Sequence, residues 1–276
     1  MKIISLGVGI QTVAMYIMSS EKELERCDYA IFADTGGEKT ATINYYDFLL
    51  EWAKKNNGIP LYKAEYKNLQ QDLLNHSNSS GNRFAPIPAF TMNNGKTGML
   101  RRQCTMEYKI GQVNKKIREI LDLPGKSRFP IIEIWQGITI DEVHRMTIPK
   151  ERWKIHVYPF CGYKVYSDGN FERIDTEIRS RNNIIYWFKK NGLELPEKSS
   201  CVFCPFQSDQ NWLRLKNNYP DDFNRAIIVD KAIRDSSKKG IKCPIYLHES
   251  LKPLDEVKFD EDKNHLWGNC TDYCDI

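Results

Sequence analysis

Apolar and polar residues alternate at two different spacings along the first part of the chain. Short apolar runs, typical of buried strands, occupy residues 2–6, 29–33 and 61–64. Between these runs, residues 11–20 and 40–55 place apolar side chains three and four positions apart, as one face of a helix does. The order strand–helix–strand–helix–strand predicts a parallel sheet with helices packed on it.

After an interruption, later segments continue this α/β pattern. Residues 76–98 are rich in Asn, Ser and Gly and show no period, which is typical of a functional or a mobile loop. Elsewhere the pattern predicts a strand at 131–134 and helices at 108–121, 178–190, 211–216 and 222–234. A chain of 276 residues has room for one large α/β domain, or for one domain with an appendage.

Composition adds few constraints. Apolar residues make up 41% of the chain, which is enough for a core, and the formal net charge of +4 gives no strong electrostatic argument for nucleic acid. No run approaches the roughly 18 apolar residues of a membrane span, and Ser5 and two glycines interrupt the first apolar stretch. We therefore expect a cytoplasmic protein with no membrane partner.

The turn after the first predicted strand is rich in glycine. Gly7 and Gly9 lack a Cβ, so backbone N–H groups and the start of the next helix can approach a phosphate closely. Thr12 can add a hydroxyl. The spacing matches neither the Walker loop nor the G-x-G-x-x-G fingerprint, because Thr12 stands in the place of the third glycine. A tight turn that needs glycine for its own geometry is the alternative interpretation.

Asp34 and Thr35 directly follow the second predicted strand. Ligands of open parallel sheets bind beyond the carboxyl ends of the strands, and there Asp34 can accept hydrogen bonds from adenine or ribose. The alternative is that Asp34 caps the helix that follows. Four arginines can clamp a phosphate or sulfate through paired hydrogen bonds, namely Arg101, Arg102, Arg145 and Arg181. A surface position or an ordinary ion pair is the alternative for each.

The cysteines indicate a metal site. The chain has eight and nothing that points to secretion, so close pairs favour metal binding over disulfides. Thiolates hold zinc or iron–sulfur clusters in sets of four, and two close pairs provide such a set: Cys201, Cys204, Cys270 and Cys274. Mixed sets that use Cys104 or Cys161 are alternatives, as are cysteines buried without a metal.

A set of segments in order along the chain carries a family resemblance. The set comprises S-x-G-x-G-x-Q-T from Ser5, FADTGGE at 32–38, RRQCT at 101–105 with Lys109, GITIDEVHRM at 137–146, and SRNNIIYW followed by KSSCVFCPF. It resembles the phosphoadenosine phosphosulfate (PAPS) reductase-like branch of the adenine nucleotide α-hydrolase superfamily. The first segment lies over that family's PP-loop, usually written SGGxDS. Gln11 replaces its aspartate, so the resemblance implies nucleotide binding more directly than hydrolysis.

The resemblance implies a Rossmann-like parallel-sheet domain of the adenine nucleotide α-hydrolase type. Residues 1–150 would bind the nucleotide, and residues 151–276 would form a helical region with the metal-binding cysteines. The ligands implied are ATP or a related adenine nucleotide, Mg²⁺, and either a [4Fe–4S] cluster or Zn²⁺. The nucleotide contacts would be Ser5, Gly7, Gly9, Gln11, Thr12, Asp34, Thr35, Gly137 and Arg145. The phosphate or substrate contacts would be Arg101, Arg102, Lys109 and Arg181.

Cys104 has three interpretations. Arg101, Arg102 and Lys109 flank it, and cations favour the reactive thiolate, so we predict a catalytic thiol. An inert core residue is the second interpretation. By the resemblance, a cluster ligand is the third.

Three functions follow as hypotheses. The first is ATP-dependent formation of an adenylate with release of pyrophosphate, then transfer of sulfur from a donor, with tRNA or DNA as a plausible acceptor by the resemblance. The second is reduction of PAPS or APS with a thioredoxin-like partner. Such reductases typically carry a Glu-Cys-Gly segment near the C-terminus, where this chain has Asn269-Cys270-Thr271. The third is a non-catalytic nucleotide-sensing or nucleic-acid-binding module of phage or defence origin, which Gln11 favours.

Overall fold

The computed structural model describes residues 1–78, 80–81, 84, 87–93, 95–125, 127–237, 241 and 243–260. Its strands are β1 (Lys2–Leu6), β2 (Tyr29–Ala33), β3 (Leu61–Ala64), β4 (Phe90–Asn93), β5 (Lys96–Met99), β6 (Ile132–Trp135), β7 (Lys154–Tyr158), β8 (Tyr163–Val165), β9 (Phe171–Arg173) and β10 (Ile245–Tyr246). Its α-helices are α1 (Ile10–Ser20), α2 (Thr40–Asn56), α3 (Leu69–Leu74), α4 (Gly111–Ile120), α5 (Arg181–Lys190), α6 (Asp209–Asn218) and α7 (Pro220–Ile233). The described residues also include a π-helix, η1 (Thr105–Ile110), and two 3-10 helices, η2 (Ile140–Arg145) and η4 (Leu254–Glu256).

Within the described residues, one sheet of seven strands forms the centre of the molecule. Its order is β3-β2-β1-β6-β7-β8-β9. The strands from β3 to β7 pair in parallel, and β8 and β9 add an antiparallel edge. The parallel α/β sheet that the spacing of apolar residues predicts is therefore confirmed.

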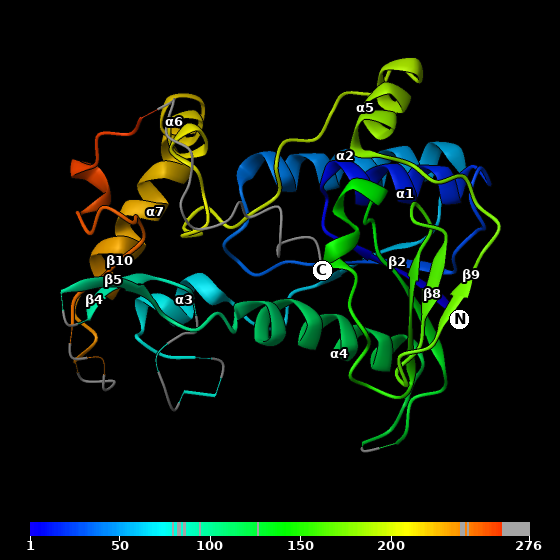
Figure 1. Cartoon of the computed structure of the whole chain (residues 1–276), viewed down its shortest axis with the longest axis horizontal. Helices are drawn as coiled ribbons and strands as arrows, with labels where there is room; N and C mark the ends of the chain where they lie inside the picture. The colour runs from blue at the N-terminus through cyan, green and yellow to red at the C-terminus, as the bar shows by residue number, and fades with distance from the viewer. Residues whose placement is uncertain are drawn as a thin grey trace.

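Helices cover both faces of this sheet. In Figure 1, α1, α2 and α5 lie above it and α4 lies below. Side chains alternate along β1 accordingly, because successive residues of a strand point to opposite faces. Ile4 and Leu6 pack with α1 and α5, whereas Ile3 packs with Val113 of α4.

The change of face occurs at β1. The connections from β1 to β2 and from β2 to β3 run through α1 and α2 on one face. The chain then returns along α4, on the other face, to β6 on the far side of β1. The carboxyl ends of β1 and β6 therefore border a topological switch point, where open α/β sheets bind ligands.

A second core lies beside the sheet, at the left of Figure 1. The helices α3, α6 and α7 pack around buried aromatic residues such as Trp212 and Phe223. A small sheet in the order β10-β4-β5 closes it. The prediction of an irregular segment over 76–98 is wrong there, because this segment contains β4 and the start of β5. Its partner β10 is some 150 positions away, as the pairing of Thr91 with Ile245 shows, so no local pattern announces the sheet.

The expected boundary at residue 150 falls between two paired strands. β6 and β7 are parallel neighbours, so the central sheet takes strands from both 1–150 and 151–276. The second part contributes α5, α6 and α7, and it also contributes β7, β8 and β9. In the ranges that the structure describes, no helix is long and apolar enough to cross a membrane.

Gly137 allows the turn after β6 to pack against α1. A Cβ at this position would lie 2.9 Å from the carbonyl carbon of Gln11 and 2.9 Å from the backbone nitrogen of Thr12. Because backbone atoms at the start of a packed helix cannot move aside easily, Gly137→Ala should lower the free energy of unfolding by about 1–3 kcal/mol. Urea titration followed by circular dichroism measures the change.

Gly98→Ala is the matched control. The nearest atom to its Cβ would be the carbonyl oxygen of Thr91, at 4.0 Å. This variant should stay within about 0.5 kcal/mol of the parent protein. Equal stability of the two variants would contradict the proposed close approach.

Candidate nucleotide and thiol site

The loop between β1 and α1 contains a left-handed residue. Val8 has a φ of 55°, a conformation that costs a β-branched residue about 1–3 kcal/mol. Its side chain is fully buried in the core that also includes α1. This burial holds a backbone turn that glycine would adopt more easily. The strained residue lies between Gly7 and Gly9, in the predicted phosphate loop.

The first turn of α1 is suited to an anion. Gly9 is the N-cap residue, and no acidic residue occurs in the first turn. Oγ1 of Thr12 lies 3.2 Å from both the nitrogen and the carbonyl oxygen of Gly9. The Thr12 hydroxyl, which we expected to contact a ligand, therefore holds the loop against the helix. The partial positive charge of the helix N-terminus favours an anion beside this loop.

Gln11 joins three segments of the chain in one polar cluster. Its Nε2 donates to Oε2 of Glu142 at 2.9 Å, and its Oε1 accepts from Nη1 of Arg181 at 3.2 Å. Glu142 Oε2 also accepts from Nη1 of buried Arg145 at 2.9 Å. The structure thus brings together Gln11, Arg145 and Arg181, which the sequence had named as site residues.

Two other expected nucleotide contacts, Gly137 and Ser5, lie in different places: one against the start of α1 and the other next to α4. Gly137 packs against the start of α1, so its missing Cβ serves packing at the loop. Ser5 lies on the face of β1 that carries Ile3, and it lines a cavity next to α4. Of these two residues, Gly137 alone adjoins the loop.

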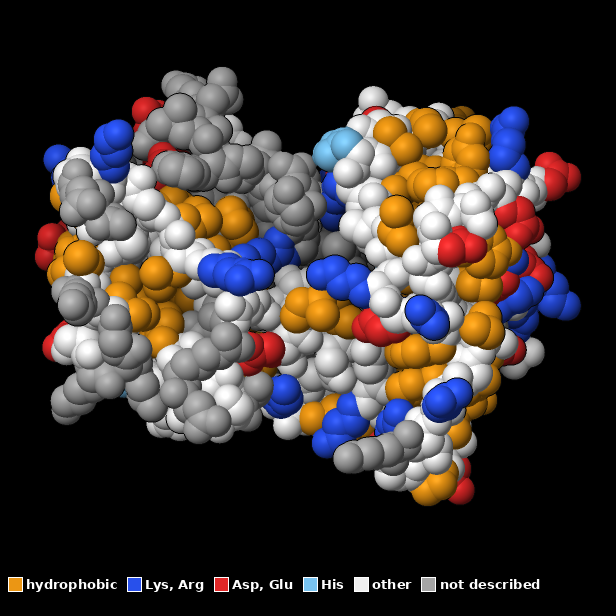
Figure 2. All heavy atoms as spheres, turned by 60° about the horizontal axis from the view of Figure 1, so that its bottom comes forward, with side chains coloured by type: hydrophobic (Ala, Val, Ile, Leu, Met, Phe, Trp, Pro, Cys, Tyr) orange, Lys and Arg blue, Asp and Glu red, His pale blue; other side chains and the backbone are white. Residues whose placement is uncertain are grey.

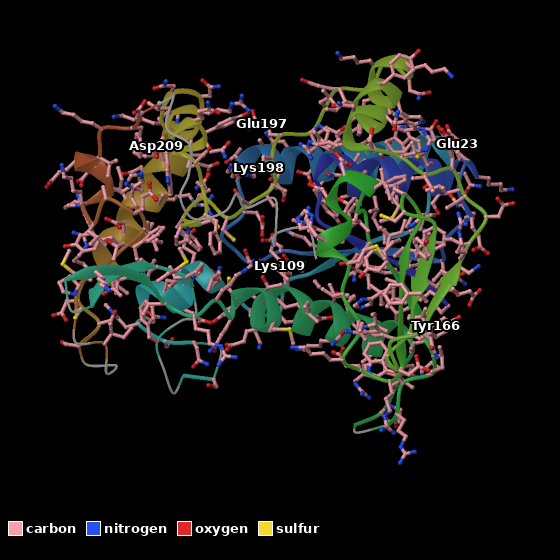
Figure 3. The ribbon with its side chains drawn as sticks, in the orientation of Figure 1. Glu23, Lys109, Tyr166, Glu197, Lys198 and Asp209 are labelled. Carbon is pink, nitrogen blue, oxygen red and sulfur yellow. The ribbon has the colours of Figure 1, made fainter. Side chains whose placement is uncertain are left out.

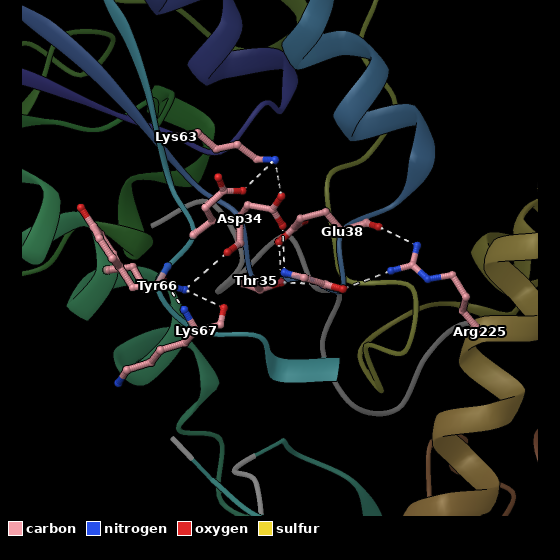
Figure 4. A network of polar contacts seen from close by, with 11 residues as sticks. Asp34, Thr35, Glu38, Lys63, Tyr66, Lys67 and Arg225 are labelled. Atoms are coloured by element: carbon pink, nitrogen blue, oxygen red, sulfur yellow. Dashed lines mark hydrogen bonds and ion pairs between the residues drawn. The ribbon is translucent and has the colours of Figure 1, made fainter. Parts of the chain in front are cut away.

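A polar network fixes the loop after β2 (Figure 4). Oδ2 of Asp34 lies 2.8 Å from Nζ of Lys63, and its Oδ1 accepts from the N–H of Gly36 at 2.8 Å. Arg225 of α7 donates to the carbonyl oxygens of Gly36 and Glu38, at 3.2 Å each. The loop is therefore held from the sheet and from α7.

Asp34 does not cap α2, so that alternative is wrong. The backbone N–H of Thr40 donates to Oδ2 of Asp222 at 2.8 Å, and its hydroxyl donates to Oδ1 at 3.0 Å. Asp222 lies on α7 and is 2% exposed. The cap therefore comes from a residue 182 positions away, which no local motif could reveal.

Gln112 of α4 ties the ends of β2 and β3 together. Its Oε1 accepts from the N–H groups of Tyr66 and Lys67, at 2.5 and 3.1 Å. Its Nε2 donates to the carbonyl oxygens of Tyr108 and Asp34, at 2.8 and 3.4 Å. Sequence reasoning missed Gln112, because a glutamine on a predicted helix is more often a surface residue.

Cys201 and Cys204 lie on a tight turn against the β2 loop. The N–H of Cys204 donates to the carbonyl oxygen of Cys201 at 3.1 Å. Sγ of Cys201 lies 3.3 Å from Oγ1 of Thr35 and 3.9 Å from Oε1 of Glu38. Burial, with a smaller effect of Glu38, raises the pKa of the Cys201 thiol well above its usual value. Without a metal this thiol stays protonated at neutral pH.

Cys104 gathers with these two thiols. It is half-buried and, like Cys201, it packs against the second core. Burial raises the pKa of Cys204, Cys104 raises it further, and Arg102 and Lys109 lower it. Figure 3 labels Lys109 near the middle of the molecule, close to the start of α4. Three predicted thiols and two predicted cations therefore lie in one region, and Arg101 of the same segment is exposed.

Two buried charged residues near the three thiols, Glu38 and Lys39, were not among the predicted site residues. Oε1 of Glu38 lies 3.0 Å from Oγ1 of Thr35 and 3.8 Å from Nζ of Lys109. Nζ of Lys39 donates to the carbonyl oxygen of Lys198 at 3.4 Å, and burial lowers the pKa of Lys39. Glu38 is the last residue of the FADTGGE segment, so this segment could have indicated it as a site residue. No feature of the sequence indicated Lys39.

No complete metal site lies within the described part of the chain. No group of three His, Cys, Asp or Glu side chains there is arranged to hold a metal ion. Cys270 and Cys274 of the predicted set lie outside the described residues. Cys161 belongs to a separate apolar cluster, where its Sγ donates to the carbonyl oxygen of Ile138 at 3.2 Å.

The fold and the loop define the chain as an α/β protein with a mostly parallel, Rossmann-like sheet. No known family model matches the chain, and no curated protein matches its sequence.

Asp222→Ala tests how the β2 loop is held. The variant removes two hydrogen bonds to Thr40 and the 2.9 Å ion pair with Arg225. Since the lost carboxylate is buried, we expect the free energy of unfolding to fall by about 3 kcal/mol, as measured by urea titration. Glu51→Gln, which breaks an exposed pair with Lys54, is the control and should cause no measurable change. Unchanged stability of Asp222→Ala would refute the role of Asp222 in holding the loop.

Proposed function

We propose that this chain binds an adenine nucleotide over the carboxyl ends of β1 and β2 and belongs with the PAPS reductase-like proteins. The conformation of Val8 carries the proposal. Valine replaces the PP-loop glycine, yet its φ of 55° keeps the left-handed turn that glycine favours. A strained residue in a loop between a strand and a helix N-terminus is typical of a functional site.

Arg145 and Arg181 are the residues that would hold the phosphates. Guanidinium groups bind phosphate oxygens through paired hydrogen bonds and stabilise charge that develops there during reaction. Gln11 positions Arg181 through its amide oxygen, and Glu142 positions Arg145. The amide adds no negative charge beside the phosphates, whereas the family's aspartate would.

Mg²⁺ fits this loop less well than the nucleotide does. Hard cations prefer carboxylate and water oxygens, and position 11 offers a neutral amide. The nearby carboxylate of Glu142 is already engaged by Gln11 and Arg145. The chain's own cations therefore carry the charge of the phosphates in this proposal.

The reaction we propose is adenylation followed by sulfur transfer. An oxygen of the substrate attacks the α-phosphorus, and pyrophosphate leaves with the electron pair of the broken P–O bond. A reduced sulfur donor then attacks the activated carbon, and AMP leaves as that C–O bond breaks. A nucleic-acid base is the acceptor class that the resemblance implies.

We further propose that Cys201 and Cys204 bind a metal centre with Cys270 and Cys274, the set formed by the two close pairs of the sequence. The tight turn that brings Cys201 and Cys204 together supports it. Cys104, which lies close enough to Cys204 to raise its pKa, stays the proposed catalytic thiol. Thiolate sets of this kind suit an iron–sulfur cluster or zinc, and a cluster would supply electrons or bind sulfur.

Arg181→Gln should weaken ATP binding about tenfold, because a charge-assisted hydrogen bond to phosphate is lost. Isothermal titration calorimetry measures the dissociation constant. Arg173→Gln, at an exposed position on β9, should bind ATP as the parent does. Unchanged affinity in Arg181→Gln would refute the phosphate role.

Pyrophosphate release from ATP with RNA or DNA distinguishes adenylation from a non-catalytic module, and sulfite release from PAPS or APS would identify a reductase.

Metal content distinguishes the roles of Cys104. In anaerobically prepared protein, Cys201→Ser should lose most of the bound iron or zinc and Cys104→Ser should retain it, as measured by elemental analysis and visible absorption. Cys243→Ser, at an exposed thiol, should retain it. Loss of metal in Cys104→Ser would instead favour the mixed ligand set with Cys104. Full content in Cys201→Ser would refute the ligand set.

A further inference from the structure

A cavity of about 300 Å³ lies on the α4 side of the sheet. Ser5 of β1, Gln136 directly after β6 and His156 of β7 line it, and residues of the segment at 147–151 also line it. Figure 2 views the molecule with the α4 side turned forward, where apolar side chains alternate with lysine and arginine side chains. The volume of the cavity lies at the lower end of the range for small-molecule sites.

Strand register builds the floor of this cavity. Ile3 of β1 lies opposite Ile134 of β6, which lies opposite His156 of β7. Residues two positions apart in a strand point to the same face, so Ser5 and Gln136 join that row at the carboxyl ends. The floor therefore carries three polar side chains beside the apolar Ile134.

One helix supplies the facing wall. Ile110, Val113 and Asn114 are three and four positions apart, so they lie on the same side of α4. Lys154 and Glu151 pair at 3.1 Å along one side of the cavity. Most of the wall is apolar, which suits a flat, uncharged body.

His156 presents an acceptor. Burial lowers the pKa of its imidazole to about 4, so the ring is neutral at pH 7. Nδ1 lies 3.0 Å from the carbonyl oxygen of Thr147, which can only accept. Nδ1 therefore carries the proton, and Nε2 is left as an acceptor.

Two amide oxygens add further acceptors. Oε1 of Gln136 and Oδ1 of Asn114 are buried and have no hydrogen-bond partner within the described residues. Gln136 is 2% exposed. The Asn114 side chain interacts with Glu151, which fixes its orientation. Buried amide oxygens are normally paired, so unpaired ones on two residues that line the same cavity point to a ligand with N–H groups.

We propose that this cavity binds an amino-substituted heteroaromatic base, such as adenine or cytosine. The apolar wall takes the ring, and Gln136, Asn114 and His156 accept from its N–H groups. This pocket lies on the α4 face, whereas Gln11 and the Val8 loop adjoin α1 on the other face, so the proposal does not depend on the nucleotide site. The base comes either from a free nucleoside or from single-stranded nucleic acid.

Calorimetry with paired nucleosides tests the proposal. Adenosine should bind about tenfold tighter than inosine, and cytidine about tenfold tighter than uridine, because the second of each pair lacks the amino group. Arg181→Gln, which alters the separate nucleotide site, should bind adenosine as the parent protein does. Equal binding within each pair, no binding at millimolar concentration, or loss of adenosine binding in Arg181→Gln would overturn the proposal.

Gln136→Leu separates ligand binding from a structural role. The variant should lose most adenosine affinity, yet its melting temperature without ligand should be unchanged or higher, because an unpaired buried amide becomes apolar. Gln71→Leu, at an exposed position on α3, is the control and should bind as the parent. Undiminished adenosine binding by Gln136→Leu would overturn the proposal.

Oligo(A) and oligo(dA) titrations identify the source of the base. Tighter binding than adenosine indicates nucleic acid, and weaker binding indicates the nucleoside.

Discussion

The helical connections between strands change from one face of the sheet to the other at β1, and the rest of the structure depends on this constraint. α1 and α2 pack on one face of the sheet and α4 packs on the other. The turns that follow β1 and β6 therefore meet at one edge of the sheet, and Gly137 approaches the first turn of α1 closely. Residues of very different sequence position, such as Gln11 and Arg181, become neighbours there because of topology.

The elements nearest this edge were also the most predictable from sequence. Apolar periodicity predicted β1, α1, β2, α2 and β3 to within a residue or two, because each of them is locally amphipathic or buried. The sheet β10-β4-β5 was missed because its strands are short and its pairing is long-range. The Asp222 cap on α2 and the hydrogen bonds by which Gln112 ties β2 to β3 could not be predicted for the same reason. Both depend on which helices pack together.

The residues of the loop between β1 and α1 fit one another. Val8 keeps a left-handed backbone because its side chain gains a fully buried site, and that burial offsets the strain. Gln11 keeps a bridging position because an amide can accept from Arg181 and donate to Glu142 at once. A carboxylate at position 11 could accept from Arg181 but would repel Glu142. The glutamine and the local arrangement of charges are therefore consistent with each other.

The β2 loop connects the two halves of the candidate site. Asp34 belongs to the sheet edge through Lys63, and Thr35, the next residue, contacts Sγ of Cys201. Glu38 then reaches Lys109 in the thiol region. A ligand that drew Lys63 away from Asp34 would act on a segment whose far end packs on Cys201, only a few residues away. Because Arg225 and Asp222 hold this segment from α7, packing between the sheet and the second core fixes the position of Asp34 relative to Cys201.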